Sequence, residues 1–173
     1  MKTLYLVRHA KSDWSNMRLA DHDRPLNARG SRAARLMGDH LANEGIAPDL
    51  VICSTALRAR QTLAGIDTAF KQPWPRVFEP QVYGADTGSL LALIRRQDDD
   101  THAVMMVGHN PGFQDLAITL APHGDDDDLA QLYRKLPTGA FIEIELDITS
   151  FSDIAPGCGT LRRFVRPKSL IAG

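Results

Sequence analysis

Short apolar segments alternate with helix-like segments along the chain, and this alternation restricts the fold more than any other feature. The segments at 3–7, 50–53 and 103–107 are largely apolar, which is typical of strands covered on both faces of a sheet. Between them, apolar residues recur at helical spacing, as in the helix predicted after Pro25 and ending near Gly45. Strands that alternate with helices predict a layered α/β domain.

The remaining segments continue this pattern. Helices are predicted over 56–70, 89–96, 110–120 and 129–136, and strands over 76–78, 141–146 and 159–165, the last at a sheet edge. Asn110 and Pro111 are expected as the N-cap and first residue of one helix. With 173 residues, no internal repeat and no linker-like stretch, we expect a single domain over residues 1–173.

The composition excludes several classes of protein. Hydrophobic residues make up 43% and charged residues 24%, which is unlike a disordered or collagen-like chain. A net charge of −1 argues against non-specific nucleic-acid binding, and no apolar stretch approaches the roughly 20 residues that span a bilayer. Cys53 and Cys158 make no disulfide framework, and the first residues contain no signal-peptide core, so we expect a cytoplasmic protein.

Charge is unevenly distributed along the chain. Between Arg8 and Arg35 there are seven basic residues and three acids, whereas Asp98–Asp100 and Asp125–Asp128 hold seven of the 21 acids. The basic excess suits a small anion better than a nucleic-acid backbone. A solvated helix face that includes Arg29 and Arg32 accounts for part of it.

Basic side chains follow three of the apolar strands. Arg8 and His9 come directly after the first strand, Arg58 lies at the start of the helix after the second, and His109 follows the third. In an open α/β sheet, ligands bind beyond the carboxyl ends of the strands. If the three strands are parallel neighbours, two arginines and two histidines share one small site.

These side chains predict phosphoryl chemistry. Two guanidinium groups offer planar forks of donors that match phosphoryl oxygens, and a neutral imidazole can attack phosphorus and carry the phosphoryl group. Because the cations are side chains, we expect no metal or other cofactor, and the sequence has no HExxH motif or P-loop. Nearby arginines should lower the pKa of a nucleophilic histidine but also oppose protonation of the second, so which imidazole carries a proton stays open.

At these positions the sequence resembles the histidine phosphatase superfamily. The stretch LYLVRHAKSDW, with Arg8 and His9, is similar to the N-terminal motif of that family. STALRARQT at 54–62 resembles its second-arginine motif, and VGHNP at 107–111 resembles its second-histidine motif. The pattern DHDRPL at 21–26, followed by Gly30, and the small chain size resemble the SixA branch of phosphohistidine phosphatases.

The resemblance covers residues 2–146 and implies a phosphoglycerate mutase-like fold. That fold is a three-layer α/β/α sandwich with a mainly parallel central sheet. The resemblance also implies that His9 is the phosphorylated nucleophile, and that Arg8, Arg58 and His109 complete the phosphate pocket.

The general acid of larger family members has no clear counterpart in this chain. Counting back from the pair Tyr83-Gly84 places Pro80 where those members have a glutamate, with Glu79 one residue away. Ala10 also replaces the usual glycine of the first motif, which calls for an ordinary backbone conformation there.

The loop after His9 offers other polar groups. Asp21 and Asp13 are alternative candidates for the general acid, although helix-cap or solvated-loop roles suit them equally. Lys11 and Ser15 are candidate substrate-binding residues. Four further histidines are expected to face solvent: His22, His40, His102 and His123.

We therefore expect a metal-independent phosphatase that forms a phosphohistidine on His9 and dephosphorylates phosphohistidine on a partner protein. A weak acid suits such a phosphoramidate, because imidazole can leave as a neutral group whereas an alkoxide needs a proton. The alternatives are a phosphatase of small phosphoesters or phosphoramidates, a mutase, and a module that binds phosphate or a phosphoprotein without turnover. Neither a nucleic-acid nor a membrane partner is expected, and the sequence leaves the oligomeric state open.

Overall fold

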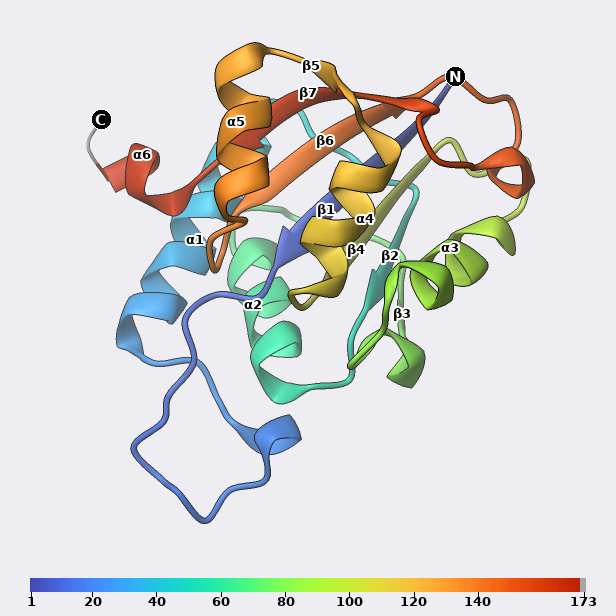
Figure 1. Cartoon of the computed structure of the whole chain (residues 1–173). Helices are drawn as coiled ribbons and strands as arrows, with labels where there is room; N and C mark the ends of the chain where they lie inside the picture. The colour runs from blue at the N-terminus through green and yellow to red at the C-terminus, as the bar shows by residue number, and fades with distance from the viewer. Residues whose placement is uncertain (172–173) are drawn as a thin grey trace.

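The structure, a computed structural model, describes residues 1–171 and is organised around a seven-stranded sheet (Figure 1). Its strands are β1 (Lys2–Arg8), β2 (Leu50–Cys53), β3 (Arg76–Phe78), β4 (Ala103–Gly108), β5 (His123–Gly124), β6 (Phe141–Leu146) and β7 (Gly159–Val165). They lie in the order β3-β2-β4-β1-β6-β7-β5, and β6 runs antiparallel to both its neighbours while every other pair is parallel. The mainly parallel sheet is confirmed.

Helices cover both faces of this sheet and give the expected three-layer sandwich. One layer contains α1 (Ala28–Asn43), α2 (Leu57–Asp67) and α6 (Pro167–Ile171), and the other contains α3 (Thr87–Arg95), α4 (Gly112–Leu120) and α5 (Asp126–Arg134) (Figure 1). In β1, Tyr5 and Val7 pack toward the first layer, whereas Leu4 and Leu6 pack toward the second. Both faces of the central strands are thus buried, which explains why these strands are largely apolar. None of the described helices combines the length and apolar character needed to cross a bilayer.

The C-terminal half departs from expectation in two places. β7 is not an edge strand, because the two-residue strand β5 pairs with its outer side. α4 begins at Gly112 rather than Pro111, although the Asn110 side chain still accepts a hydrogen bond from the backbone N–H of Gln114 at 3.2 Å. A strand of two residues shows no periodicity, so the sequence pattern could not reveal β5.

The start of α5 also differs, because the acidic run belongs to the helix. The Asp125 side chain accepts hydrogen bonds from the backbone N–H groups of Asp127 and Asp128, and α5 begins at Asp126 instead of Leu129. Carboxylates at a helix N-terminus interact favourably with its dipole. This run therefore stabilises a helix end.

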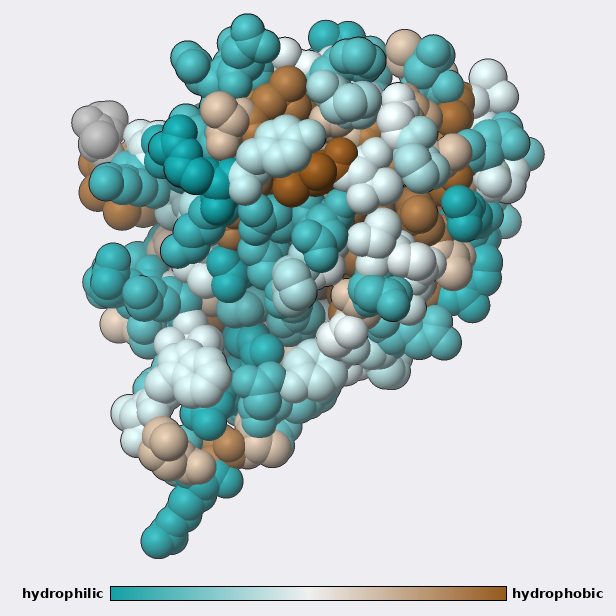
Figure 2. All heavy atoms as spheres, viewed as in Figure 1, coloured by the Kyte–Doolittle hydropathy of each residue, from teal (hydrophilic) through white to brown (hydrophobic). Residues whose placement is uncertain are grey.

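The loop between β1 and α1 packs closely against the start of α1. A Cβ atom at Gly30 would lie 2.1 Å from the carbonyl oxygen of Lys11, so glycine is required for this approach. The middle of the loop extends away from the body of the molecule (Figure 1), and a 3-10 turn at Asp21–Asp23 then contacts the start of α2. Figure 2 shows the same loop as a protrusion, and it exposes Trp14 and Met17.

Candidate active site

The three loops expected to form a site do meet at one end of the sheet. β4 lies between β2 and β1, and all three strands are parallel. The His9 backbone N–H donates to the Gly108 carbonyl at 2.8 Å, and the Ser54 N–H donates to the Val107 carbonyl at 2.9 Å. These bonds hold the strand ends together, and the rings of His9 and His109 lie with their centroids 5.2 Å apart.

His9 presents an unprotonated Nε2. Its Nδ1 lies 2.7 Å from the carbonyl oxygen of Ala10, and because a carbonyl only accepts hydrogen bonds, Nδ1 carries the proton. The lone pair on Nε2 accepts a hydrogen bond from Nε of Arg58 at 3.3 Å. Thr62 ties these elements together, since its hydroxyl accepts from the Ala10 N–H at 2.9 Å and donates to the Arg58 carbonyl at 2.7 Å.

Arg58, buried at the start of α2, uses its remaining nitrogens to bind Asp21. Its Nη1 donates to the Asp21 carbonyl at 2.6 Å, and its Nη2 donates to the Asp21 carboxylate at 3.0 Å. The Tyr83 hydroxyl donates to the same carboxylate, and this bond, followed by the contacts with Arg58, lowers the pKa of Asp21. Asp21 is therefore ionised at neutral pH and positions Arg58, which does not favour the role of general acid.

Two buried nitrogens at the site have no hydrogen-bond partner within residues 1–171. They are Nδ1 of His109, whose Nε2 lies 2.7 Å from the Ser54 hydroxyl, and Nε of Arg8, whose Nη1 donates to the Leu136 carbonyl at 2.9 Å. When the serine hydroxyl donates to Nε2, Nδ1 carries a hydrogen and can donate to an anion. Buried polar atoms without partners are rare, and here the oxygens of a bound anion would supply the missing acceptors.

Both histidines are neutral at physiological pH. Burial lowers the pKa of His9 to about 4, and the charges of Arg58 and Arg8 act in the same direction against the hydrogen bond to the Ala10 carbonyl. The pKa of His109 falls to about 3, mainly through burial and then through His9 and Arg58. Nε2 of His9 therefore carries a lone pair at neutral pH.

The structure does not bring the other candidate residues into this group. Asp13 accepts a hydrogen bond from the Ser15 backbone N–H at 2.7 Å, and the side chain of Lys11 is exposed. Within residues 1–171, the side chains of Asp13, Lys11 and Ser15 form no hydrogen bond or ion pair with Arg58 or either histidine. The same residues contain no cluster of three side chains suited to a metal ion.

Two residues at the site were missed by sequence reasoning. His22 was expected to face solvent, and its side chain is only partly exposed: Nε2 lies 2.8 Å from the Thr55 hydroxyl, and the ring packs edge-on against Tyr83 at 5.0 Å. Tyr83 in turn packs edge-on against His109 at 5.3 Å. The sequence drew attention to Tyr83 only through the Tyr83-Gly84 pair. The position of this pair in the sequence does not indicate that Tyr83 lies close to His109 in the fold.

Comparisons with known proteins agree with this geometry. The family model of the histidine phosphatase superfamily (branch 1) matches residues 4–104. An uncharacterized protein of Mycobacterium tuberculosis is 40% identical over 94% of this chain and 100% of its own length. A second uncharacterized protein, from Mycobacterium leprae, is 36% identical over 76% of this chain and 82% of its own length.

Solved structures of similar shape carry the SixA name. The SixA protein of Nakamurella multipartitia superimposes with a TM-score of 0.80 at 30% identity, covering 96% of each chain. That of Agrobacterium tumefaciens gives a TM-score of 0.78 at 30% identity over 96% of this chain and 99% of the other. The protein histidine phosphatase SixA complexed with tungstate gives a TM-score of 0.78 at 23% identity, over 97% of this chain and 99% of the other. This match shows that the two proteins share a fold.

Proposed function

The chain belongs to the histidine phosphatase superfamily, in its SixA-type branch, and from this premise we propose that it dephosphorylates phosphohistidine on a partner protein through a phosphohistidine formed on His9. The observation that carries the proposal is the unprotonated Nε2 of His9, which faces Arg58. An imidazole with a free lone pair beside guanidinium groups is suited to attack on phosphorus.

In the first half-reaction, Arg8, Arg58 and His109 hold the phosphoryl oxygens. Arg58 turns its Nε–H from His9 to one of these oxygens, which releases the lone pair of Nε2. Nε2 then bonds to phosphorus while the bond between phosphorus and the leaving nitrogen breaks in line with it. The electron pair of the broken bond returns to that nitrogen, so a substrate ring protonated on its other nitrogen leaves as neutral imidazole.

The phosphorylated ring of His9 is then positively charged. Its Nδ1–H still donates to the Ala10 carbonyl, a hydrogen bond that strengthens as the charge develops. In the second half-reaction, the oxygen of a water molecule bonds to phosphorus and the bond to Nε2 breaks. The electron pair returns to Nε2, the water proton passes to phosphate or solvent, and His9 regains its starting form.

The acid–base groups of the site support a phosphoramidate substrate. Asp21 is ionised, and the Glu79 carboxylate accepts a hydrogen bond from the Gln81 backbone N–H at 3.1 Å instead of reaching the histidines. A site with no protonated carboxyl group is poorly suited to an alkoxide leaving group, whereas neutral imidazole needs no further proton. The names of the structural neighbours, phosphohistidine phosphatases among them, support the same substrate class.

The test compares two substrates under identical conditions in EDTA. One is a histidine-phosphorylated phosphotransfer domain, and the other is p-nitrophenyl phosphate. We expect release of phosphate from the phosphoprotein to be the faster reaction, to persist in EDTA and to disappear in His9→Asn. Faster release from the ester would assign the site to small phosphoesters, and the absence of a phosphorylated enzyme with either substrate would favour a binding module.

A further inference from the structure

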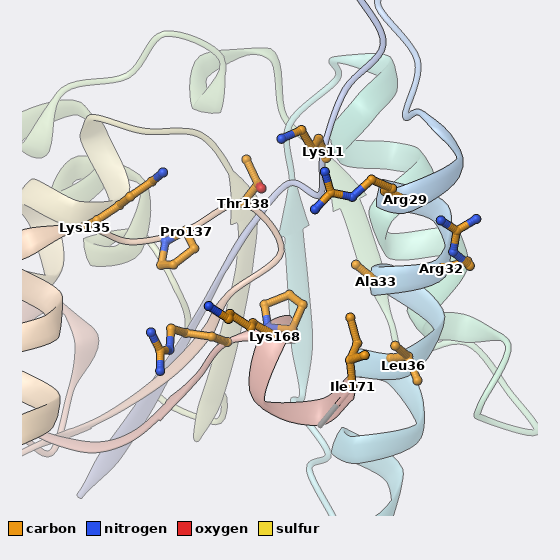
Figure 3. Close-up of a pocket in the computed structure, with 12 residues that line it drawn as sticks. Lys11, Arg29, Arg32, Ala33, Leu36, Lys135, Pro137, Thr138, Lys168 and Ile171 are labelled. Carbon is orange, nitrogen blue, oxygen red and sulfur yellow. The ribbon is translucent and has the colours of Figure 1, made fainter. Parts of the chain in front are cut away.

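A cavity of about 730 Å³ lies between α1 and the C-terminal segments (Figure 3). Six of the residues that line it are basic: Lys11, Arg29, Arg32, Lys135, Arg166 and Lys168. We call this cavity the basic groove. It is lined by no acidic residue, and within residues 1–171 none of the six cations forms an ion pair.

Two walls and an apolar strip form the basic groove. On one side, α1 contributes Arg29, Arg32, Ala33 and Leu36, whose spacing of three and four places them on one helix face (Figure 3). The turn at 135–138 and the segment 166–168 form the opposite side. The apolar residues of the lining, which we call the apolar strip, are Ala33, Leu36, Pro137, Pro167 and Ile171.

The turn at 135–138 joins the basic groove to the active site. The carbonyl of Leu136, in the middle of this turn, accepts the hydrogen bond from Nη1 of Arg8. Gly139, which directly follows the turn, donates its N–H to the carbonyls of both Arg8 and His9, at 3.0 and 2.9 Å. A molecule seated in the basic groove would therefore lie against the segment that holds the nucleophile.

The lining of the basic groove restricts what can occupy it. Six cations with no acidic residue beside them favour a negatively charged occupant, and the apolar strip favours aliphatic contacts. The lining has no aromatic ring on which a base could stack. None of its side chains is a buried polar group of the kind that fixes a small ligand. An acidic helix with aliphatic residues on one face meets both requirements.

We propose that the basic groove binds an acidic, amphipathic segment of the phosphorylated partner protein and so presents the partner's phosphohistidine to His9. This inference rests on the proposed function for the identity of the partner. Contacts of this kind add specificity and speed of association, and they weaken as salt is added.

Fluorescence anisotropy tests the basic groove without any catalytic step. The probe is a fluorescein-labelled helical peptide of about 16 residues, with Leu at positions i, i+3, i+4 and i+7 and Glu elsewhere. The protein variant is Arg32→Glu combined with Lys168→Glu. The matched control is Arg35→Glu combined with Lys71→Glu, because both control residues are exposed, Arg35 lies on the same helix, and neither lines the basic groove.

We expect the peptide to bind the native protein and the control with equal affinity, and to bind the groove variant at least about tenfold more weakly. The affinity should fall with added salt, and a peptide with Lys in place of Glu should not bind. Equal loss in the groove variant and the control would overturn the proposal. Tighter binding of a single-stranded RNA oligonucleotide or of phosphatidylserine vesicles than of the acidic peptide would overturn it as well.

The same measurement on His9→Asn separates the two proposals. Peptide binding that persists in this variant, together with absent phosphatase activity in the native protein, would leave the basic groove standing and remove the proposed function. Phosphatase activity without peptide binding would support the proposed function and overturn the proposal for the basic groove.

Discussion

Arg58 donates its Nε–H to Nε2 of His9 across 3.3 Å, so the lone pair proposed to attack phosphorus is already engaged in the ligand-free site. The same guanidinium is held from its other side by Asp21. A bound phosphoryl group must compete for the Nε–H before His9 can react. In the proposed mechanism, catalysis therefore depends on three groups linked by hydrogen bonds: Asp21, Arg58 and His9.

Replacement of His9 by Asn removes the nitrogen that we propose attacks phosphorus. We expect kcat to fall by at least about 10³-fold, because no covalent intermediate can form. Rapid alkaline quenching with a ³²P-labelled substrate should detect a phosphoprotein in the native chain and none in the variant. His40→Asn, on α1, is the control and should remain active. A labelled His9→Asn protein would show that another residue is the nucleophile.

Replacement of Asp21 by Asn tests positioning against acid catalysis. Asn keeps the shape but loses the charge that holds Arg58, and we expect kcat/KM to fall by about tenfold for phosphohistidine and for p-nitrophenyl phosphate alike. Asp39→Asn, at an exposed carboxylate on α1, is the control and should have no effect. A loss confined to esters with poor leaving groups would instead identify Asp21 as the general acid.

The two histidines should remain neutral in mildly acidic solution. The pKa values of about 4 for His9 and about 3 for His109 lie below the ordinary value of about 6.5. In ¹⁵N NMR spectra recorded from pH 7.5 down to pH 5, their ring nitrogens should keep the shifts of neutral imidazole. Added phosphate should raise the pKa of His109, since the anion stabilises its charged form. Titration of both rings near pH 6.5 would contradict this account of the site.

The same pKa values link stability to pH. Each ring binds a proton more readily in the unfolded chain, so the free energy of unfolding should decrease as the pH falls from about 6.5 toward the folded pKa values. For His109, the decrease between pH 6.5 and pH 4.5 should be about 2 kcal/mol. Urea unfolding at a series of pH values measures the free energy of unfolding as a function of pH. The decrease due to His109 should be present in the native protein and absent in His109→Gln. If the free energy of unfolding changed with pH in the same way in both proteins, the His109 ring would not contribute to the pH dependence of stability.

Gly30 should tolerate no side chain. In Gly30→Ala the new Cβ would meet the backbone of Lys11, so we expect the free energy of unfolding to fall by about 2 kcal/mol and activity to fall as the loop shifts. Gly88→Ala is the matched control on α3, where the nearest atom to the new Cβ is 3.7 Å away. Its stability should be unchanged or slightly higher. Thermal unfolding of both variants provides the comparison.

The strand ends of the site were predictable because burial on both faces leaves a strong signal in the sequence. Three largely apolar strands, each followed by a loop or helix start with a basic side chain, predict that His9, Arg58 and His109 lie together. The spatial neighbours of these residues were not predictable in the same way. Asp21 and Tyr83 are 62 positions apart and meet through a tertiary contact that has no periodic pattern.

The basic groove shows the same limit. Its cations come from four separate segments, so the sequence shows only an excess of positive charge near the N-terminus. Arg32 and Arg35 are alike in sequence terms, yet only Arg32 lines the basic groove. The choice between them depends on how α1 is rotated against its neighbours, which the full packing of the domain decides.

Within residues 1–171, Nε of Arg8 and Nδ1 of His109 are buried without hydrogen-bond partners. Such atoms lower the stability of the fold relative to a chain in which the same positions are satisfied. An anion that supplied both missing acceptors would bind the folded chain alone, so the anion and the fold would stabilise each other.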